Sequence, residues 1–90
     1  MDGGWNAVIM AVVSVGTTAT KIGPSIGRNE KLVIQNLGTG ELYVDVSDSV
    51  TTANGLEVPE DAVMEFRMAT VYGIAASGTR DVRWVLQRAE

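Results

Sequence analysis

The stretch KLVIQNLGTGELYVDV, residues 31–46, decides the fold expected for this chain. Apolar side chains recur at every second residue in both of its halves, which places them on one face of a sheet and the intervening side chains on the other. The apolar face carries Leu32, Ile34, Leu42, Val44 and Val46. Between the halves, NLGTG (residues 36–40) supplies residues that tolerate a positive φ, as a tight turn requires. The pattern predicts an antiparallel hairpin that is buried on one face.

Further short strands are expected on both sides of this stretch, separated by Gly, Asn and Pro residues. Residues 56–58 read as a short edge strand stopped by Pro59, and residues 62–68, 71–76 and 80–87 read as strands that alternate or carry small residues. No segment shows sustained helical periodicity. The prediction is an all-β fold in which residues 1–90 form a single domain, a small antiparallel β-sandwich or jelly-roll-like barrel of about seven to eight short strands.

The interior of this domain is expected to collect one face of several strands. In residues 62–68, alternation places Met64, Phe66 and Met68 on the same face. The shared interior is predicted to contain Leu32, Ile34, Leu42, Val44, Phe66, Val82 and Trp84.

The N-terminal segment AVIMAVVSV, residues 7–15, differs from the other strands because it is apolar on both parities. A strand with one wet face alternates, so this segment is either covered on both faces or helical, and its Val and Ile content favours a strand. In so small a chain, the second face of this strand is covered either by another subunit or, if the strand is fully internal, by the rest of the chain. The sequence leaves both alternatives open. Residues 1–12 are therefore expected to form an N-terminal arm or an interface strand, with residues 2–6 as the arm and Trp5 as its anchor. A frayed terminus is the alternative.

Composition excludes several classes of function. The chain has no cysteine and no histidine, which removes disulfides, thiol nucleophiles, zinc–thiolate sites and the commonest general base. The net charge is −4 and the seven basic residues are scattered, which argues against nucleic acid as a partner. No run approaches the roughly 20 apolar residues of a membrane span, and Asp2 stands where a secretion signal would carry a basic residue. The hydrophobic share of 46% suits a protein that buries surface by associating.

Two oxygen-rich clusters are candidates for metal binding or catalysis. The first comprises Asp45, Ser47, Asp48 and Ser49, but its spacing matches no EF-hand loop, and such residues in turns usually cap their own backbone. The second comprises Glu57, Glu60, Asp61 and Glu65, which fall on expected turns and outward strand positions. We therefore expect solvated surface, no metal site, no cofactor and no catalytic residues, and the chain is predicted not to be an enzyme.

The aromatic residues are Trp5, Tyr43, Phe66, Tyr72 and Trp84. Tyrosine and tryptophan faces can stack on sugars or anchor protein interfaces. Tyr43 is flanked by Glu41 and Asp45 on the parity expected to face solvent, whereas Trp84 shares its parity with core residues. The residues predicted to contact a partner are Trp5, Val8, Met10, Val12 and Tyr43.

Several motifs taken together resemble a known family. IQNLG (34–38), VTTANG (50–55) and IAASGT (74–79), preceded by VSVGTTATKI (13–22), resemble a small domain of tailed double-stranded-DNA bacteriophage virions. The likeness covers about residues 13–86 and is to capsid decoration (cement) proteins and to head-fibre or spike-base proteins. The resemblance implies a β-sandwich that self-associates and has no catalytic residues. It favours a trimer, because such proteins often sit on local threefold axes.

The resemblance sets the expected function. The chain is predicted to be a decoration protein on the outer capsid surface of a virion, synthesised in the host cytoplasm, that binds the assembled major capsid protein and stabilises it. The alternative is a head-fibre or tail-associated module that presents or attaches a receptor- or glycan-binding element. The expected partners are further copies of the chain and the major capsid protein, without nucleic acid, membrane or cofactor.

Overall fold

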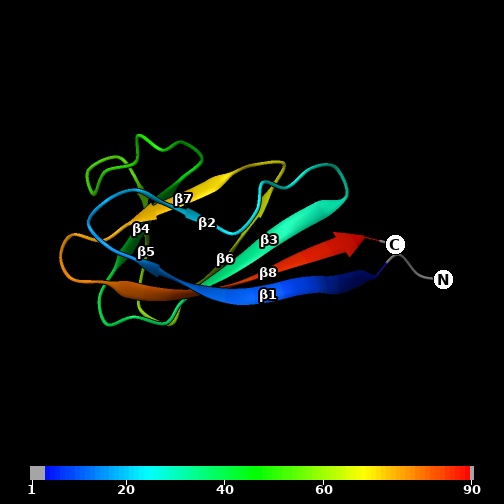
Figure 1. The fold of residues 1–90 in the computed structure, drawn as a ribbon, viewed down its shortest axis with the longest axis horizontal. Helices are drawn as coiled ribbons and strands as arrows, with labels where there is room; N and C mark the ends of the chain where they lie inside the picture. Colours follow the sequence, from blue (N-terminus) through cyan, green and yellow to red (C-terminus); the bar gives the residue numbers. More distant parts are fainter. Residues whose placement is uncertain (1–3, 90) are drawn as a thin grey trace.

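A computed structural model describes residues 4–89, which form eight strands without a helix (Figure 1). The strands are β1 (Trp5–Val15), β2 (Thr20–Ile22), β3 (Glu30–Asn36), β4 (Leu42–Asp45), β5 (Leu56–Val58), β6 (Val63–Arg67), β7 (Val71–Ile74) and β8 (Arg80–Ala89). Within this described part, no helix is long and apolar enough to cross a membrane. The predicted all-β fold and number of strands are confirmed.

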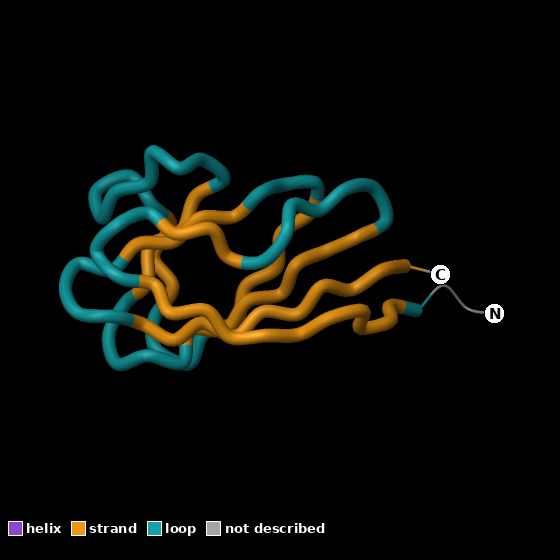
Figure 2. The backbone as a smooth tube through the Cα atoms, viewed as in Figure 1, coloured by secondary structure: helices purple, strands orange, loops and turns teal. Residues whose placement is uncertain are grey.

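The strands form two antiparallel sheets of four. The first sheet has the order β1-β8-β3-β6 and the second has the order β2-β7-β4-β5. Figure 2 shows β1, β3 and β8 running on toward the end of the molecule where both termini lie, beyond the region where the two sheets face each other. The arrangement is that of a small β-sandwich.

The core lies between the two sheets, as the alternation predicted. Leu32, Ile34, Leu42, Val44 and Val82 are fully buried there, and Phe66 and Trp84 are partly buried against them. Two residues that the alternation placed on the same strand faces as core residues lie outside the core. Met68 and Val46 are exposed, because β6 ends at Arg67 and β4 ends at Asp45, so that neither residue continues the alternation of its strand.

The predicted hairpin of residues 31–46 is wrong. Its first half is β3, which pairs with β6 and β8 in the first sheet, and its second half is β4, which pairs with β5 and β7 in the second sheet. Residues 37–41 therefore cross from one sheet to the other. The crossing sets the two apolar faces opposite each other across the core, whereas a hairpin would leave both on one side of a single layer.

Asn36 holds this crossing in place. It is fully buried, and its side-chain amide donates hydrogen bonds to the carbonyl oxygens of Gly40 (2.9 Å) and Val58 (3.0 Å). Its Oδ1 accepts a third bond, of 3.0 Å, from the backbone N–H of Gly38. The side chain thereby ties the end of β3 to the connection and to β5 in the second sheet.

Gly38 lets the connection lie directly on the start of β8. A Cβ at this position would lie 2.8 Å from both Cα and Cδ of Arg80, and the Cα belongs to the backbone and cannot easily move. We expect Gly38→Ala to lower the free energy of unfolding by about 1–3 kcal/mol, the usual cost of overpacking. Gly16→Ala is the control, since its Cβ would meet nothing closer than 3.8 Å. Urea unfolding of both variants tests this, and equal stabilities would contradict the packing described here.

Candidate interaction surface

β1 is the edge strand of the first sheet, and it exposes apolar side chains along most of its length. It pairs with β8 on one side and with no described strand on the other. Its 11 residues include no charged residue, proline or glycine. Val8, Ile9, Met10 and Val12 are each 47–59% exposed. The expected strand is confirmed. The alternative of a fully internal strand, covered on both faces by the described chain itself, is wrong.

The exposed side chains of β1 lie on both faces because the sandwich does not extend over them. Met10 and Val12 lie opposite Val85 and Arg83 of β8, on the outer face of the first sheet, meaning the face turned away from the second sheet. Ile9 lies opposite Leu86 and so has the inward parity, yet it remains 51% exposed. The register shifts between Ala7 and Ile9, which marks a β-bulge at this point.

The other three sheet edges are protected in the ways usual for soluble proteins. β2 and β5 are three residues long, and β5 is followed by Pro59. β6 directs Glu65 and Arg67 outward. Short length, charge and proline all discourage pairing with another chain, and β1 has none of these three. A β-bulge also discourages pairing, and β1 carries one between Ala7 and Ile9, so that residues 9–15 are the regular part of its open edge.

An apolar row runs inward from β1 across the outer face. Met10 lies opposite Val85, and Val85 lies opposite Val33 on β3. These side chains, with Val63 on β6, line a shallow hollow of about 160 Å³. The sequence prediction did not group Val33, Val63 and Val85 with Met10, because their own strands alternate and only strand pairing brings them near Met10.

Trp5 begins β1 and does not belong to an arm. Its half-buried ring reaches across the outer face, with Nζ of Lys31 4.6 Å and Cζ of Arg67 4.9 Å from the ring centroid. Such cation–π contacts hold the indole on its own sheet. The part of the predicted arm that falls on residues 1–3 lies outside the described residues.

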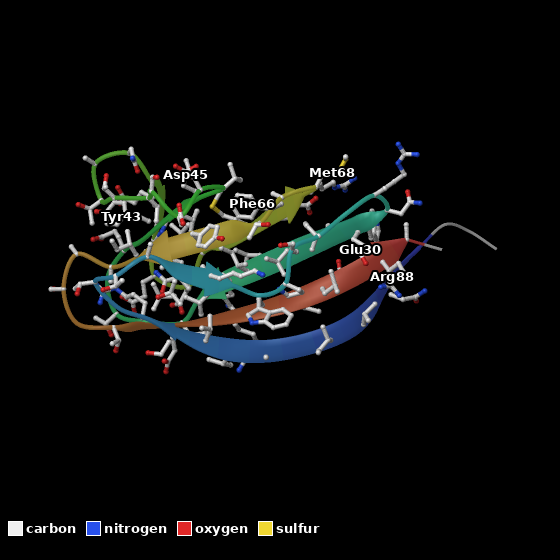
Figure 3. The ribbon with its side chains drawn as sticks, turned by 45° about the horizontal axis from the view of Figure 1, so that its top comes forward. Glu30, Tyr43, Asp45, Phe66, Met68 and Arg88 are labelled. Atoms are coloured by element: carbon white, nitrogen blue, oxygen red, sulfur yellow. The ribbon has the colours of Figure 1, made fainter. Side chains whose placement is uncertain are left out.

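Tyr43 lies apart from the other predicted contact residues. It belongs to β4 in the second sheet, opposite Glu57 and Ile74, and is half-buried. Figure 3 shows it near the opposite end of the molecule from Glu30 and Arg88. The structure thus brings Trp5, Val8, Met10 and Val12 together on one strand and leaves Tyr43 on another sheet. Ile9 is the β1 residue that the prediction missed, and its signal was the unbroken apolar run.

The two oxygen-rich clusters make local contacts. Oδ1 of Asp45 accepts a 2.7 Å hydrogen bond from the N–H of Val46, and Oγ of Ser47 accepts one of 3.1 Å from the N–H of Ser49. Glu65 pairs with Lys31 at 3.6 Å and with Arg67 at 3.2 Å. In residues 4–89, no group of three or more Asp or Glu side chains is placed to hold a metal ion.

Glu30 and Arg88 form an ion pair at the end of the first sheet near Trp5. Oε2 of Glu30 lies 2.9 Å from Nη2 of Arg88, and its Oε1 accepts a 2.9 Å bond from the backbone N–H of Gly27. The Gly27 bond first, and Arg88 second, lower the pKa of the Glu30 carboxyl below its ordinary value of 4.5.

This lowered pKa predicts a loss of stability in acid. A carboxyl whose folded-state pKa is depressed stabilises the fold above its unfolded pKa and loses that contribution as the pH falls through the folded pKa. We expect the melting temperature of the native chain to fall more steeply below pH 4.5 than that of Glu30→Gln. Glu57→Gln, on the exposed strand β5, is the control and should follow the native curve. Identical curves for the native chain and Glu30→Gln would contradict the prediction.

The candidate surface is thus apolar and extended, and it offers side-chain packing and an open strand edge. The sequence matches no protein-family model and no curated protein with significant similarity. The resemblance to virion proteins therefore stays a prediction from the sequence motifs.

Proposed function

We propose that this chain is a structural subunit that associates through β1 and acts as a capsid decoration protein, binding the assembled major capsid protein of a tailed phage. The observation that carries the association is the long, uncharged and exposed edge strand β1. The virion setting rests on the motif resemblance at residues 34–38, 50–55 and 74–79.

The energetics of β1 support association. Burying apolar surface stabilises a complex by about 25 cal/mol per Å², and β1 presents four large apolar side chains that are about half exposed. In a symmetric lattice each contact is repeated many times, so each copy needs only a modest affinity. A ligand that binds only the assembled lattice stabilises it by mass action.

Composition supports a role without catalysis. The chain carries neither histidine nor cysteine. Of the clustered carboxylates, Asp45 accepts a hydrogen bond from the N–H of Val46, and Glu65 pairs with Lys31 and Arg67. A non-catalytic structural role fits this composition.

Self-association is tested by sedimentation of the intact chain. We expect oligomers at tens of micromolar, and we expect Met10→Lys to weaken them at least tenfold, because a charge would be placed within the apolar surface. Leu56→Lys is the matched control, since Leu56 is 55% exposed, against 59% for Met10, and lies on β5 of the second sheet. A native chain that stays monomeric throughout, or equal effects of the two variants, would contradict the role of β1.

The decoration role is tested by counting copies of the chain in purified virions. A layer that covers the capsid lattice requires on the order of hundreds of copies, one set for each symmetry-related position. A handful of copies would instead indicate the head-fibre or tail-associated module.

A further inference from the structure

We infer that two copies pair antiparallel through the edges of β1, around a twofold axis at Met10, so that their first sheets join into one eight-stranded sheet. This inference rests on the proposed self-association and specifies its geometry. The partner at β1 is therefore a second copy of this chain.

The backbone supplies the first argument. The edge of a sheet presents N–H and C=O groups that an antiparallel strand can pair with. β1 carries no charge, so pairing it with itself opposes no like charges. Met10 is the middle residue of Trp5–Val15, so an axis there overlaps the two strands along their length, with regular pairing interrupted at the β-bulge between Ala7 and Ile9 of each copy.

The apolar row on the outer face supplies the second argument. Within one copy, Val33, Val85 and Met10 lie side by side across three strands. An axis at Met10 sets this row end to end with the same row of the second copy, joined at the two Met10 side chains. The surface that each copy exposes there becomes one continuous apolar strip, which is the self-complementarity that a twofold interface requires.

The charges at the two ends of β1 supply the third argument. Near Trp5, the described basic side chains outnumber the acidic ones; they are Arg28, Lys31, Arg67 and Arg88, against Glu30 and Glu65. At the end of the first sheet where Val15 lies, the acidic side chains outnumber the basic ones; they are Glu41, Glu60, Asp61 and Asp81, against Arg80 and Arg83. Antiparallel pairing lays the positive end of each copy beside the negative end of the other, whereas parallel pairing would align like ends.

The twofold arrangement differs from the trimer that the resemblance implies. Edge-to-edge pairing of β1 closes at two copies and uses up the exposed edge, so it forms neither a ring of three nor an open fibre. A trimer would have to bury the faces of β1 around a threefold axis and leave its edge unpaired. The two arrangements place Met10 at different distances from its symmetry mate.

Disulfide trapping tests the axis directly, because the native chain has no cysteine. Opposed residues of an antiparallel pair have Cα atoms about 4.5–5.5 Å apart, within the range of about 4.4–6.8 Å that a disulfide bridges. Met10→Cys is expected to form a covalent dimer almost completely under mild oxidation at micromolar concentration. Val8→Cys and Val12→Cys should crosslink several-fold more slowly. Leu56→Cys, on β5 of the second sheet and 55% exposed against 59% for Met10, should crosslink only at the rate of random collision.

The outcomes separate this inference from the proposed function. Circular dichroism melting of the reduced variants checks that each one folds, and a Met10→Cys variant that melts like the native chain and crosslinks fastest supports the twofold axis. A native chain that sediments as a trimer, with no preference for Met10→Cys, overturns the twofold axis and leaves self-association standing. Fastest crosslinking at Val8 or Val12 overturns the axis at Met10. A native chain that sediments only as a monomer overturns the proposed association and the axis together.

Discussion

Replacing Ile34 by alanine is expected to lower the free energy of unfolding by about 3–5 kcal/mol, a large part of the stability of a domain this small. Ile34 is fully buried at the centre of β3, where it lies opposite Trp84 of β8 and Met64 of β6. β8 is also paired with β1 on its far side, so the space left by the lost carbon atoms cannot close fully. The interior face of β3 is thus a sensitive part of the core.

Urea unfolding of Ile34→Ala measures this cost. Val63→Ala is the control on the adjacent strand β6, where the side chain is mostly exposed, and it should stay within about 0.5 kcal/mol of the native chain. Near-native stability for Ile34→Ala would mean that β3 presents its other face to the core, since a shift of one residue exchanges the two faces of a strand.

Asn36→Leu is expected to cost about 2–4 kcal/mol. The substitution removes both amide donors and the acceptor, leaving the carbonyls of Gly40 and Val58 and the N–H of Gly38 without their partner. Buried polar groups that lose their hydrogen bonds cost about 1–3 kcal/mol each, and the leucine recovers part of this through its own burial. Asn36→Asp should be at least as harmful, because it sets a carboxylate oxygen against the same two carbonyls.

Gln35→Leu serves as the control for Asn36, because it lies one residue earlier on β3 with the opposite parity. It is half-buried on the outer face and is expected to change the stability by less than about 1 kcal/mol. Equal losses at positions 35 and 36 in urea unfolding would show that the crossing between the sheets does not depend on the Asn36 hydrogen bonds.

The sequence predicted the faces of the strands better than their partners. Alternation alone assigns Leu32 and Leu42 to the interior. Every second side chain of a strand faces the core, and this does not depend on which strand is its neighbour. The same alternation fits a hairpin and a crossing between sheets equally well. Whether the connection forms a hairpin or a crossing depends on Asn36. Its hydrogen bond to Val58 joins residues 22 positions apart, and a local sequence pattern cannot predict such a contact.

The candidate surface was predictable only in part for a related reason. An unbroken apolar run such as residues 7–15 is equally compatible with a central strand and with an exposed edge, because the difference depends on how far the other sheet extends. The run predicted Val8, Met10 and Val12 as contact residues on one strand, and the structure places all three there as exposed side chains. Tyr43 was grouped with them from its charged neighbours, which say nothing about which sheet carries it.

The central proposal, that the chain associates through β1 to reinforce a shell, is tested most directly on assembled particles. Phage particles lacking the chain would be compared with particles to which the native chain, Met10→Lys or Leu56→Lys is added back, by the temperature at which they release their DNA. We expect the native chain and Leu56→Lys to raise this temperature, and Met10→Lys to leave it near that of the depleted particles. Depleted particles as heat-resistant as complete ones would contradict the decoration role, and if they also failed to attach to cells, the head-fibre alternative would replace it.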